Sequence, residues 1–431
     1  MCGGKGPTMT RKVLIRGGYL IPTAERDADI PEADILIEDD TITQVGESID
    51  AEVDQIIDAA GRVVIPGLVD LHLPLWETVL GNSIPDATWP AYVLRRETIR
   101  QSFTPDDVYV STLLGAASAL HAGVTTIVDF DDLASTPAHI DAAASALQRA
   151  QVRAVHAVVG AGDTKRHGAT TAGTPRPLPA TGVVWTGTGP AGVDRIHSAR
   201  EKNLPIFVDV GRCPEAVERL AAHSALGTDM IYLHAGDLTT RSLALVAESG
   251  GTVSWSPALN AATGQTPTAY ARLAAAGLTP ALGTGNAMVA SIDPFDQLRG
   301  AYQHARLAAH EANRHGHDAP VPTARTALGW ATTAAGRALG LSHRIGSIEP
   351  GKQADLTLLD LDVMTCGPVS CPVAAVVLGA TAAHVTDVFV AGRRLKCDGE
   401  LMDIDTESVG DAAHEAHVRI RLAADRRPAA H

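Results

Sequence analysis

The sequence lacks the marks of a secreted or membrane protein. Its five cysteines form no Cys-x-x-Cys pair and no even set, which argues against a disulfide framework; they are Cys2, Cys213, Cys366, Cys371 and Cys397. No apolar run approaches the roughly 20 residues that a membrane helix needs. The first residues contain no apolar core of a signal peptide. We therefore expect a cytoplasmic protein with no membrane partner.

Positive charge is also scarce. Lys and Arg total 35 against 49 Asp and Glu, so the net charge is -14. This balance argues against a nucleic-acid partner, whose phosphates would be repelled. It does not exclude an anionic small molecule, because the charge inside a pocket can oppose the global sign. What the chain does have is length, 431 residues, and a hydrophobic fraction of 45%, enough for one large domain and a smaller one.

The middle of the chain alternates β-branched runs with Ala/Leu-rich helical stretches. Eight runs are predicted strands: 62–72, 124–130, 152–159, 181–187, 204–210, 229–234, 251–257 and 278–285. Helical crossovers between them predict an α/β fold, a TIM-like (β/α)₈ barrel, with a doubly wound open sheet as the alternative. Because barrel enzymes place their chemistry at the carboxyl ends of the strands, the residues that close each run become site candidates.

The flanks differ from the middle. Short alternating strands with Gly and Asp turns occur on both sides of it, and they predict one small β-sandwich assembled from both chain ends. The predicted divisions are 1–64 for the N-terminal part of the sandwich, 65–339 for the catalytic barrel and 340–400 for the C-terminal part of the sandwich. Residues 401–431 should form a C-terminal helix and tail.

Three long blocks resemble the amidohydrolase superfamily, in particular its branch of cytosine/guanine deaminases and triazine hydrolases. They are IIDAAGRVVIPGLVDLH, TALGWATTAAGRALGLSHRIGSIEPGKQADLTLLD and VTDVFVAGRRL. The resemblance covers nearly the whole chain and implies a barrel with a sandwich and a site at the barrel mouth. In that family a metal is held by two histidines on strand one, a histidine on strand five and an aspartate on strand eight. A strand-six histidine stands nearby.

Most of those ligands are replaced here. His72 matches the first histidine of strand one, but Pro74 occupies the place of the second. Asp209 stands in the place of the strand-five histidine, and Gly285 in that of the strand-eight aspartate. The strand-six histidine is His234. Catalytic zinc normally takes about three protein ligands and a water, so the pattern predicts that no metal is bound.

The remaining groups suggest a catalytic set of His72, Asp209 and His234. Both histidines should point into the mouth, although each could be an inherited, hydrogen-bonded remnant. Asp209 beside an imidazole would fix its tautomer and raise its pKa as an acid/base pair, a buried salt bridge being the alternative. Glu77, just after His72, is a further catalytic candidate, or a solvated loop carboxylate.

Six residues are candidates for binding the substrate: Arg212, Trp76, Trp185, Trp255, Asp129 and Asn286. A guanidinium can grip a carboxylate or phosphate bidentately, but it could equally pair with a neighbouring acid. The tryptophans end or follow strands. They could form aromatic walls of the substrate site, or they could pack in the hydrophobic core. Asp129 belongs to an acidic cluster at the end of strand two, which suits a general acid or a helix cap. Asn286 closes the last predicted strand segment.

Two further stretches each allow two structural interpretations. The long segment 160–181 is rich in Gly, Thr and Pro, and is either a basic flap over the mouth or a solvated loop. Gly187, Gly189 and Gly192 form a lone Gly-x-Gly-x-x-Gly between two strands, which resembles a dinucleotide-binding turn. Because this unit falls inside the barrel series, we favour an ordinary strand-to-helix turn there.

Taken together, the residues predict a metal-independent enzyme with no cofactor, acting by acid/base chemistry on a small cyclic or aromatic, anionic molecule. Cyclisation, dehydration or isomerisation at a C–N or C–O centre would fit. The first alternative is a C–N hydrolase or deaminase with an altered site for one divalent metal such as zinc. The second is a non-catalytic barrel that binds a ligand. The resemblance also suggests a homo-oligomer.

Overall fold

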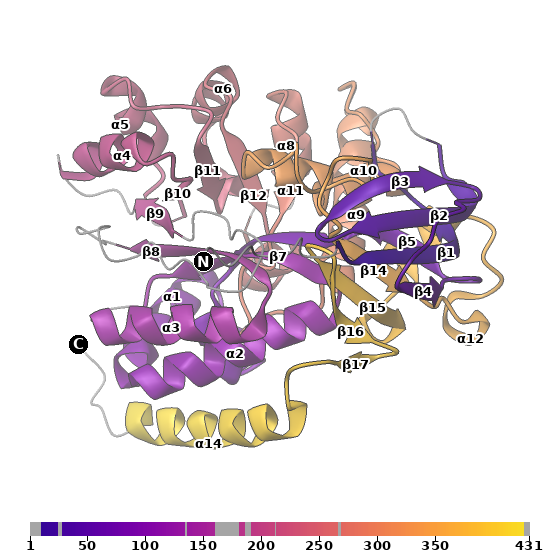
Figure 1. The fold of residues 1–431 in the computed structure, drawn as a ribbon. Helices are drawn as coiled ribbons and strands as arrows, with labels where there is room; N and C mark the ends of the chain where they lie inside the picture. The colour runs from indigo at the N-terminus through magenta and orange to yellow at the C-terminus, as the bar shows by residue number, and fades with distance from the viewer. Residues whose placement is uncertain are drawn as a thin grey trace, which may run out of the picture.

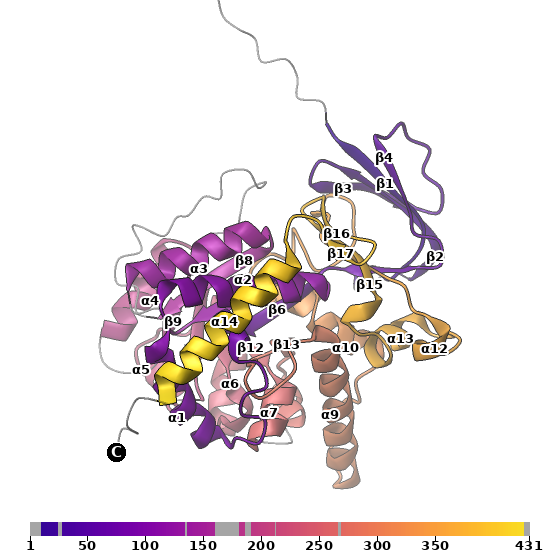
Figure 2. The same ribbon diagram turned by 90° about the horizontal axis from the view of Figure 1, so that it is seen from below.

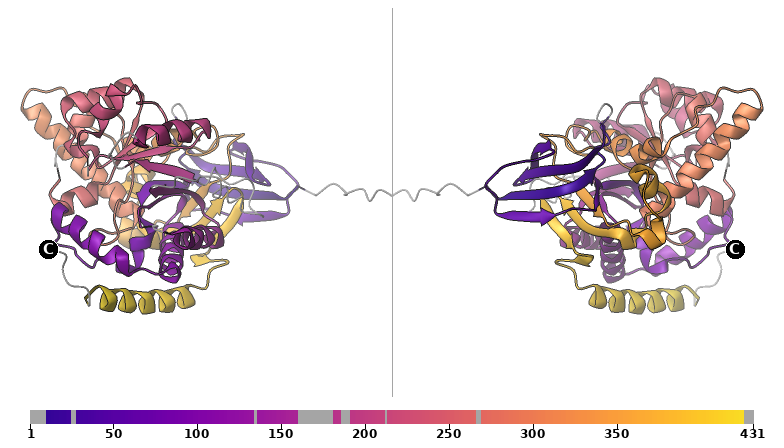
Figure 3. Two further views of the ribbon diagram at one scale, coloured as in Figure 1. Left: turned by 90° about the vertical axis from the view of Figure 1, so that its left-hand side faces the viewer. Right: turned by 90° about the vertical axis from the view of Figure 1, so that its right-hand side faces the viewer.

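The computed structural model describes residues 10–24, 28–133, 136–159, 181–185, 191–211, 213–265 and 269–425. Within these residues the chain forms two sheets, one of them covered by helices, as Figure 1 shows. In the side views of Figure 3 the second sheet projects to one side of the helix-covered body. No helix in the described ranges is long and apolar enough to cross a bilayer.

The helix-covered sheet is parallel, and its eight described strands neighbour one another in chain order. They are β6 (Leu68–Leu73), β7 (Val124–Asp131), β8 (Arg153–Val159), β9 (Thr181–Trp185), β10 (Ile206–Asp209), β11 (Met230–Leu233), β12 (Thr252–Trp255) and β13 (Ala281–Leu282). Each lies within or overlaps a run predicted from the sequence. The α/β class and the order of the strands are therefore confirmed.

Hydrogen bonds to the backbone and to a side chain of β6 also link the first and last strands of this sheet. Gly285, just after β13, donates its N–H to the carbonyl of His72 in β6 at 2.6 Å. Thr284 donates its N–H to Asp70 Oδ1 at 3.0 Å and its hydroxyl to the other oxygen of that carboxylate. The carboxyl ends of the first and last strands are thus neighbours in space.

The other sheet contains nine described strands and draws on both parts of the chain. They are β1 (Lys12–Leu20), β2 (Ile30–Glu38), β3 (Thr41–Gly46), β4 (Gln55–Asp58), β5 (Val63–Pro66), β14 (Leu356–Leu359), β15 (Val385–Val390), β16 (Arg393–Cys397) and β17 (Glu400–Leu401). β5 and β14 pair antiparallel and join the two contributions. This is the composite sheet that the sequence predicts; its folding into a sandwich stays a prediction, as do the domain boundaries.

Gly67 marks the passage from the composite sheet to the parallel one. A side chain there would place its Cβ 2.2 Å from Thr125, so the crossing of two strands requires glycine. Its N–H donates to the carbonyl of Asp355 at 2.8 Å. The Asp355 carboxylate in turn accepts two hydrogen bonds from Arg153 of β8, at 2.9 and 3.1 Å. A buried bidentate ion pair therefore fastens one sheet to the other.

Several of the helices begin at a side-chain cap. Thr104 and Asp107 form a reciprocal capping box at the start of the second helix, with Pro105 in its first turn. The helices are α1 (Trp89–Ile99), α2 (Pro105–His121), α3 (Pro137–Ala150), α4 (Ala191–Glu201), α5 (Ala216–Ala222), α6 (Thr240–Glu248), α7 (Pro257–Thr263), α8 (Ala269–Ala275), α9 (Pro294–Arg314), α10 (Ala324–Trp330), α11 (Thr333–Ala338), α12 (Val363–Cys366), α13 (Pro372–Leu378) and α14 (Thr406–Asp425).

Helix α14 packs across the outside of the helical layer, over α2, as Figure 2 shows. His417 donates from Nδ1 to the carbonyl of Val79 at 2.6 Å. Ala416 and Ile420 are buried in one apolar cluster with Trp76. The C-terminal helix therefore supports the segment that follows β6, close to the carboxyl end of the sheet.

Candidate active site

His72 lies at the carboxyl end of β6 and is the centre of the candidate site. Its side chain is buried, and its ring packs edge-on against His234 at 4.9 Å and Phe130 at 5.0 Å between centroids. Burial, followed by the nearby His234 and Arg96, holds the pKa of His72 well below its usual range. Its imidazole has no hydrogen-bond partner within the described ranges. A buried, neutral imidazole therefore lies at the carboxyl end of β6.

Asp70 supports the backbone beneath this imidazole. Its Oδ1 accepts from the N–H of His72 at 3.0 Å, and its carboxylate is held from the far side by Thr284. Burial raises the pKa of Asp70 to about 6, although the hydrogen bonds from Thr284 and His72 oppose that rise. The carboxylate therefore fixes the end of β6 against the segment after β13.

His234 follows β11 in a left-handed backbone conformation, with φ of 58°. Such a conformation is uncommon for a residue other than glycine and is often found at functional sites. The His234 ring also contacts Trp89, with centroids 4.9 Å apart. Gly211 allows this approach, because a Cβ there would lie 2.8 Å from the His234 Cβ and 3.1 Å from Trp89 Cζ2. The strand-six histidine thus stands between His72 and an indole.

Trp89 is a site residue that the sequence reasoning missed. It is the first residue of α1 and is partly exposed, and its other ring neighbour is Tyr92 at 5.4 Å. It follows a polar stretch far from any predicted strand end. A Pro at position 90, just inside the helix, is a local signal that a helix begins there.

Asp209 ends β10 and is buried, with Oδ1 accepting from the N–H of Gly211 at 3.1 Å. Ser254 of β12 has a buried hydroxyl with no hydrogen-bond partner among the residues that the structure describes. A Cβ at Gly283 would lie 2.7 Å from both the Ser254 Oγ and the His72 Cβ, so these two side chains are close neighbours across that glycine. The carboxyl ends of β6, β10, β11 and β12 therefore carry buried polar groups.

Glu77 is placed in a buried ion network. It lies in the 3-10 helix η1 (Leu75–Leu80) after β6 and is fully buried. Arg96 of α1 bridges Glu77 and Asp132, and its Nη2 donates to Asp132 Oδ1 at 2.6 Å. Tyr92 also donates its hydroxyl to Glu77 at 3.3 Å. Burial raises the pKa of Glu77 to about 7 against the opposing effect of Arg96.

Asn286 extends the same network to the segment after β13. Its Nδ2 donates to Glu77 Oε2 at 2.5 Å, while its Oδ1 accepts from the N–H groups of Met288 and Val289 at 2.6 and 3.1 Å. Both ends of the amide are therefore used inside the protein. The structure brings Glu77 and Asn286 into direct contact, and this contact links the loops around the strand ends.

Asp129 joins a second buried group, with Asp131 and His156. His156 Nε2 lies 2.9 Å from Asp131 Oδ2 and 3.7 Å from Asp129 Oδ2. The N–H of Leu75 donates to Asp129 Oδ1 at 3.1 Å. Burial is the main cause that raises the pKa of Asp129 to about 7, with His156 lowering it and Asp131 raising it. These groups connect β7 to β8 and to the segment after β6.

Two of the predicted tryptophans pack in the core. Trp76 is buried against Phe103 and donates from Nε1 to Asp132 at 3.1 Å. Trp255 is buried between Tyr270 and Trp330, at 6.1 and 5.8 Å between ring centroids. Neither indole contacts His72 or His234, so the structure does not bring them to the candidate site.

Some predicted features fall outside the described ranges. Arg212 and the segment 160–180 are among them, and so is most of the Gly-x-Gly-x-x-Gly turn. Trp185 ends β9, but its side chain is also outside those ranges. Their roles stay predictions.

Of the three replaced ligand positions, Gly285 is closed to a larger side chain. Gly285 has a φ of 84°, and a Cβ there would lie 2.6 Å from Ser256 Oγ and 2.7 Å from its Cβ. Pro74 caps η1 with an extended backbone. In the described ranges, no three His, Cys, Asp or Glu side chains group closely enough to hold a metal ion. The described residues therefore do not fit the ligand set of catalytic zinc.

The amidohydrolase family profile matches residues 208–395. A 5-methylthioadenosine/S-adenosylhomocysteine deaminase from Halobacterium salinarum is 28% identical, with 94% of this chain and 97% of the relative covered. The enzyme of the same name from Acetivibrio thermocellus is 26% identical, with 92% and 96% covered.

Solved structures share the fold. An adenosine deaminase from Xanthomonas campestris with bound zinc superposes with a TM-score of 0.83 at 22% identity, covering 96% of this chain and 99% of the other. An atrazine chlorohydrolase from Arthrobacter aurescens, complexed with zinc, gives a TM-score of 0.79 at 19% identity, with 94% and 100% covered.

These comparisons overturn two expectations from the sequence. The predicted metal-independent, non-hydrolytic reaction is wrong, because the relatives that align over nearly the full chain are named deaminases. The predicted absence of a cofactor is wrong for the same reason, since the matching structures contain zinc. Both expectations assumed that an enzyme that has lost individual metal ligands must catalyse a different reaction.

Proposed function

The chain belongs to the amidohydrolase superfamily, and from that premise we propose that it is a hydrolase of C–N bonds, a deaminase of a small amino-substituted heterocycle. The observation that carries the proposal is the alignment with named deaminases over more than nine-tenths of both chains. In this proposal the parallel sheet closes into a (β/α)₈ barrel, the composite sheet forms the sandwich, and the protein works in the cytoplasm as a homo-oligomer.

The proposed site is the group around His72 at the carboxyl ends of the strands. Its imidazole is neutral near pH 7, so it can accept a proton or a hydrogen bond from the attacking water or the amino-bearing ring. The carboxylate of Asp209 and the hydroxyl of Ser254 orient the reactants from β10 and β12. His234, held against Trp89, forms the wall on the β11 side.

A divalent metal such as zinc is the cofactor that the relatives suggest, and it would supply an activated water. Because the described residues do not present the usual ligand set, the proposed metal site is an altered one. Elemental analysis of the purified protein, followed by chelation and addition of zinc, should show at least one divalent ion per chain and a reversible loss of activity.

The reaction is tested by ammonia release from a panel of amino-substituted heterocycles that includes adenosine, 5′-methylthioadenosine and S-adenosylhomocysteine. His72→Ala should lower turnover by roughly 10²–10⁴, the usual contribution of a positioned proton-transfer group. His223→Ala is the matched control, because that histidine is exposed and bonds only to a carbonyl of its own helix. Absence of ammonia from every compound, with and without added zinc, would contradict the proposal.

A further inference from the structure

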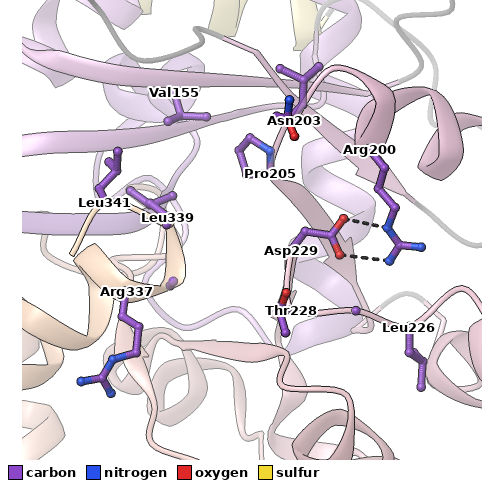
Figure 4. Close-up of a pocket in the computed structure, with 14 residues that line it drawn as sticks. Val155, Arg200, Asn203, Pro205, Leu226, Thr228, Asp229, Arg337, Leu339 and Leu341 are labelled. Carbon is purple, nitrogen blue, oxygen red and sulfur yellow. Dashed lines mark hydrogen bonds and ion pairs between the residues drawn. The ribbon is translucent and has the colours of Figure 1, made fainter. Parts of the chain in front are cut away.

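A cavity of about 700 Å³ lies at the opposite end of the parallel sheet from His72. We call it the amino-end cavity, because it opens where β10 and β11 begin. It is lined by Val155, Arg200, Asn203, Leu204, Pro205, Leu226, Gly227, Thr228, Asp229, Arg337, Ala338, Leu339, Gly340 and Leu341. Its volume falls in the range of cavities that hold small organic ligands. Figure 4 shows the lining residues.

The inner wall of the amino-end cavity is apolar. Val155 and Leu341 are buried and belong to the core cluster that fills the space between the sheet and α11. Leu339 and Pro205 are partly exposed beside them. Apolar side chains at the wall of a concave space gain free energy when a ligand removes them from water. This surface therefore favours a hydrocarbon or ring body.

Two of the three charged residues that line the amino-end cavity, Arg200 and Asp229, neutralise one another. Arg200 donates from Nε to Asp229 Oδ2 at 2.8 Å and from Nη2 to Oδ1 at 3.0 Å, and its Nη2 also donates to the carbonyl of Ala225 at 2.8 Å. Gly227 packs so closely that a Cβ there would lie 2.5 Å from both partners, which fixes the pair in place. In Figure 4 the guanidinium of Arg337 points away from this pair. The Arg200–Asp229 pair therefore adds no net charge to the wall, and Arg337 lies apart from it.

Hydrogen-bonding groups remain at the edge. Neither the Asn203 amide nor the Thr228 hydroxyl has a hydrogen-bond partner in the described ranges, and both residues are exposed. Asn203 also has a φ of 53°, so the turn presents its amide from an uncommon backbone conformation. We propose that the amino-end cavity binds a neutral amphipathic small molecule, with an apolar body against Leu339 and Leu341 and a polar group at Asn203. The site is separate from the proposed deaminase site, and its existence does not depend on that function.

The test uses N-phenyl-1-naphthylamine, a neutral probe with two apolar ring systems and one N–H group, whose fluorescence rises in apolar surroundings. We expect saturable binding of one probe per chain. Leu339→Trp fills the cavity and should weaken binding at least 10-fold. Leu307→Trp is the matched control, because Leu307 is 63% exposed on α9 and does not line the cavity, and it should leave binding unchanged.

A second variant protects the test against a folding defect. Asn203→Gly suits the positive φ and removes only the amide, so the fold should persist and the affinity should fall about 2- to 10-fold, as expected for one hydrogen bond. His72→Ala should leave the probe affinity unchanged. Unsaturable binding, binding lost in His72→Ala, or equal affinity in Leu339→Trp and wild type, with circular dichroism showing folded protein, would overturn the proposal.

Discussion

Replacing Arg96 with methionine should destabilise the protein strongly, because its guanidinium is the cation shared by two buried carboxylates. Glu77 is 0% exposed and Asp132 is 7% exposed. Removing one partner of a buried ion pair costs about 3–5 kcal/mol, since the other charge stays buried without compensation. Glu77 keeps donors from Tyr92 and Asn286, which lessens the penalty. We expect a loss of about 4 kcal/mol in the free energy of unfolding at pH 8.

The same variant should show a distinctive pH dependence. The pKa of Glu77 is about 7 with Arg96 present, and Arg96 is a group that lowers it, so the pKa of Glu77 should rise further in Arg96→Met. A carboxyl whose pKa is raised by folding stabilises the fold at low pH, and that contribution is lost as the pH rises through the folded-state pKa. The variant should therefore regain about 1–2 kcal/mol relative to wild type between pH 8 and pH 5.5, since one pKa unit corresponds to about 1.4 kcal/mol.

Urea unfolding at the two pH values measures both effects. Arg325→Met is the control, because Arg325 pairs with Asp29 at the surface, where the loss of one ion pair costs less than about 1 kcal/mol. Arg96→Lys keeps the charge but not the planar fork, so its loss should be intermediate. A loss below 1 kcal/mol at pH 8, or an equal loss at both pH values, would refute the reasoning.

Other substitutions test the remaining parts of the site. Gly285→Ala should lower the free energy of unfolding by about 1–3 kcal/mol, because the new Cβ would meet Ser256 at a φ of 84°; wild-type stability in urea would contradict this. Asp129→Asn should raise the melting temperature at pH 8 but not at pH 5, since burial raises the pKa of Asp129 to about 7 and its ionised form is the unfavourable one. Asp209→Asn should cut ammonia release by roughly 10²–10⁴ with little change in melting temperature, and full activity would remove Asp209 from the site. Size-exclusion chromatography with light scattering should give a mass above that of one chain, and a monomer would contradict the predicted homo-oligomer.

The strands, and the end of the sheet at which the candidate residues lie, could be predicted, because both follow from local patterns. Runs of β-branched residues bounded by turn residues specify strands, and the last residue of each strand identifies its carboxyl end. His72, Asp209 and His234 were placed in this way. Their meeting at one end of the sheet follows from the parallel order of the strands.

The partners of the remaining candidates could not be predicted, because they come from distant segments. Glu77 is buried by Arg96, which lies on a helix that follows a long polar stretch with no clear period. Trp255 turns to the core because alternate residues of a strand face opposite sides, and a shift of one position reverses that assignment. Trp89 lacked a signal of its own, since its position depends on the close approach allowed by Gly211.

The pairing of β5 with β14 affects how the nascent chain can fold during translation. Val64 of β5 aligns with Leu358 of β14, and the whole parallel sheet lies between them in sequence. At ribosomal rates of about 5–20 residues per second, β14 would be synthesised on the order of 15–60 s after β5. During that interval β1, β2, β3 and β5 would present an unpaired apolar strand edge, the kind of surface that promotes aggregation. Production of this protein should therefore depend on chaperones that bind nascent chains.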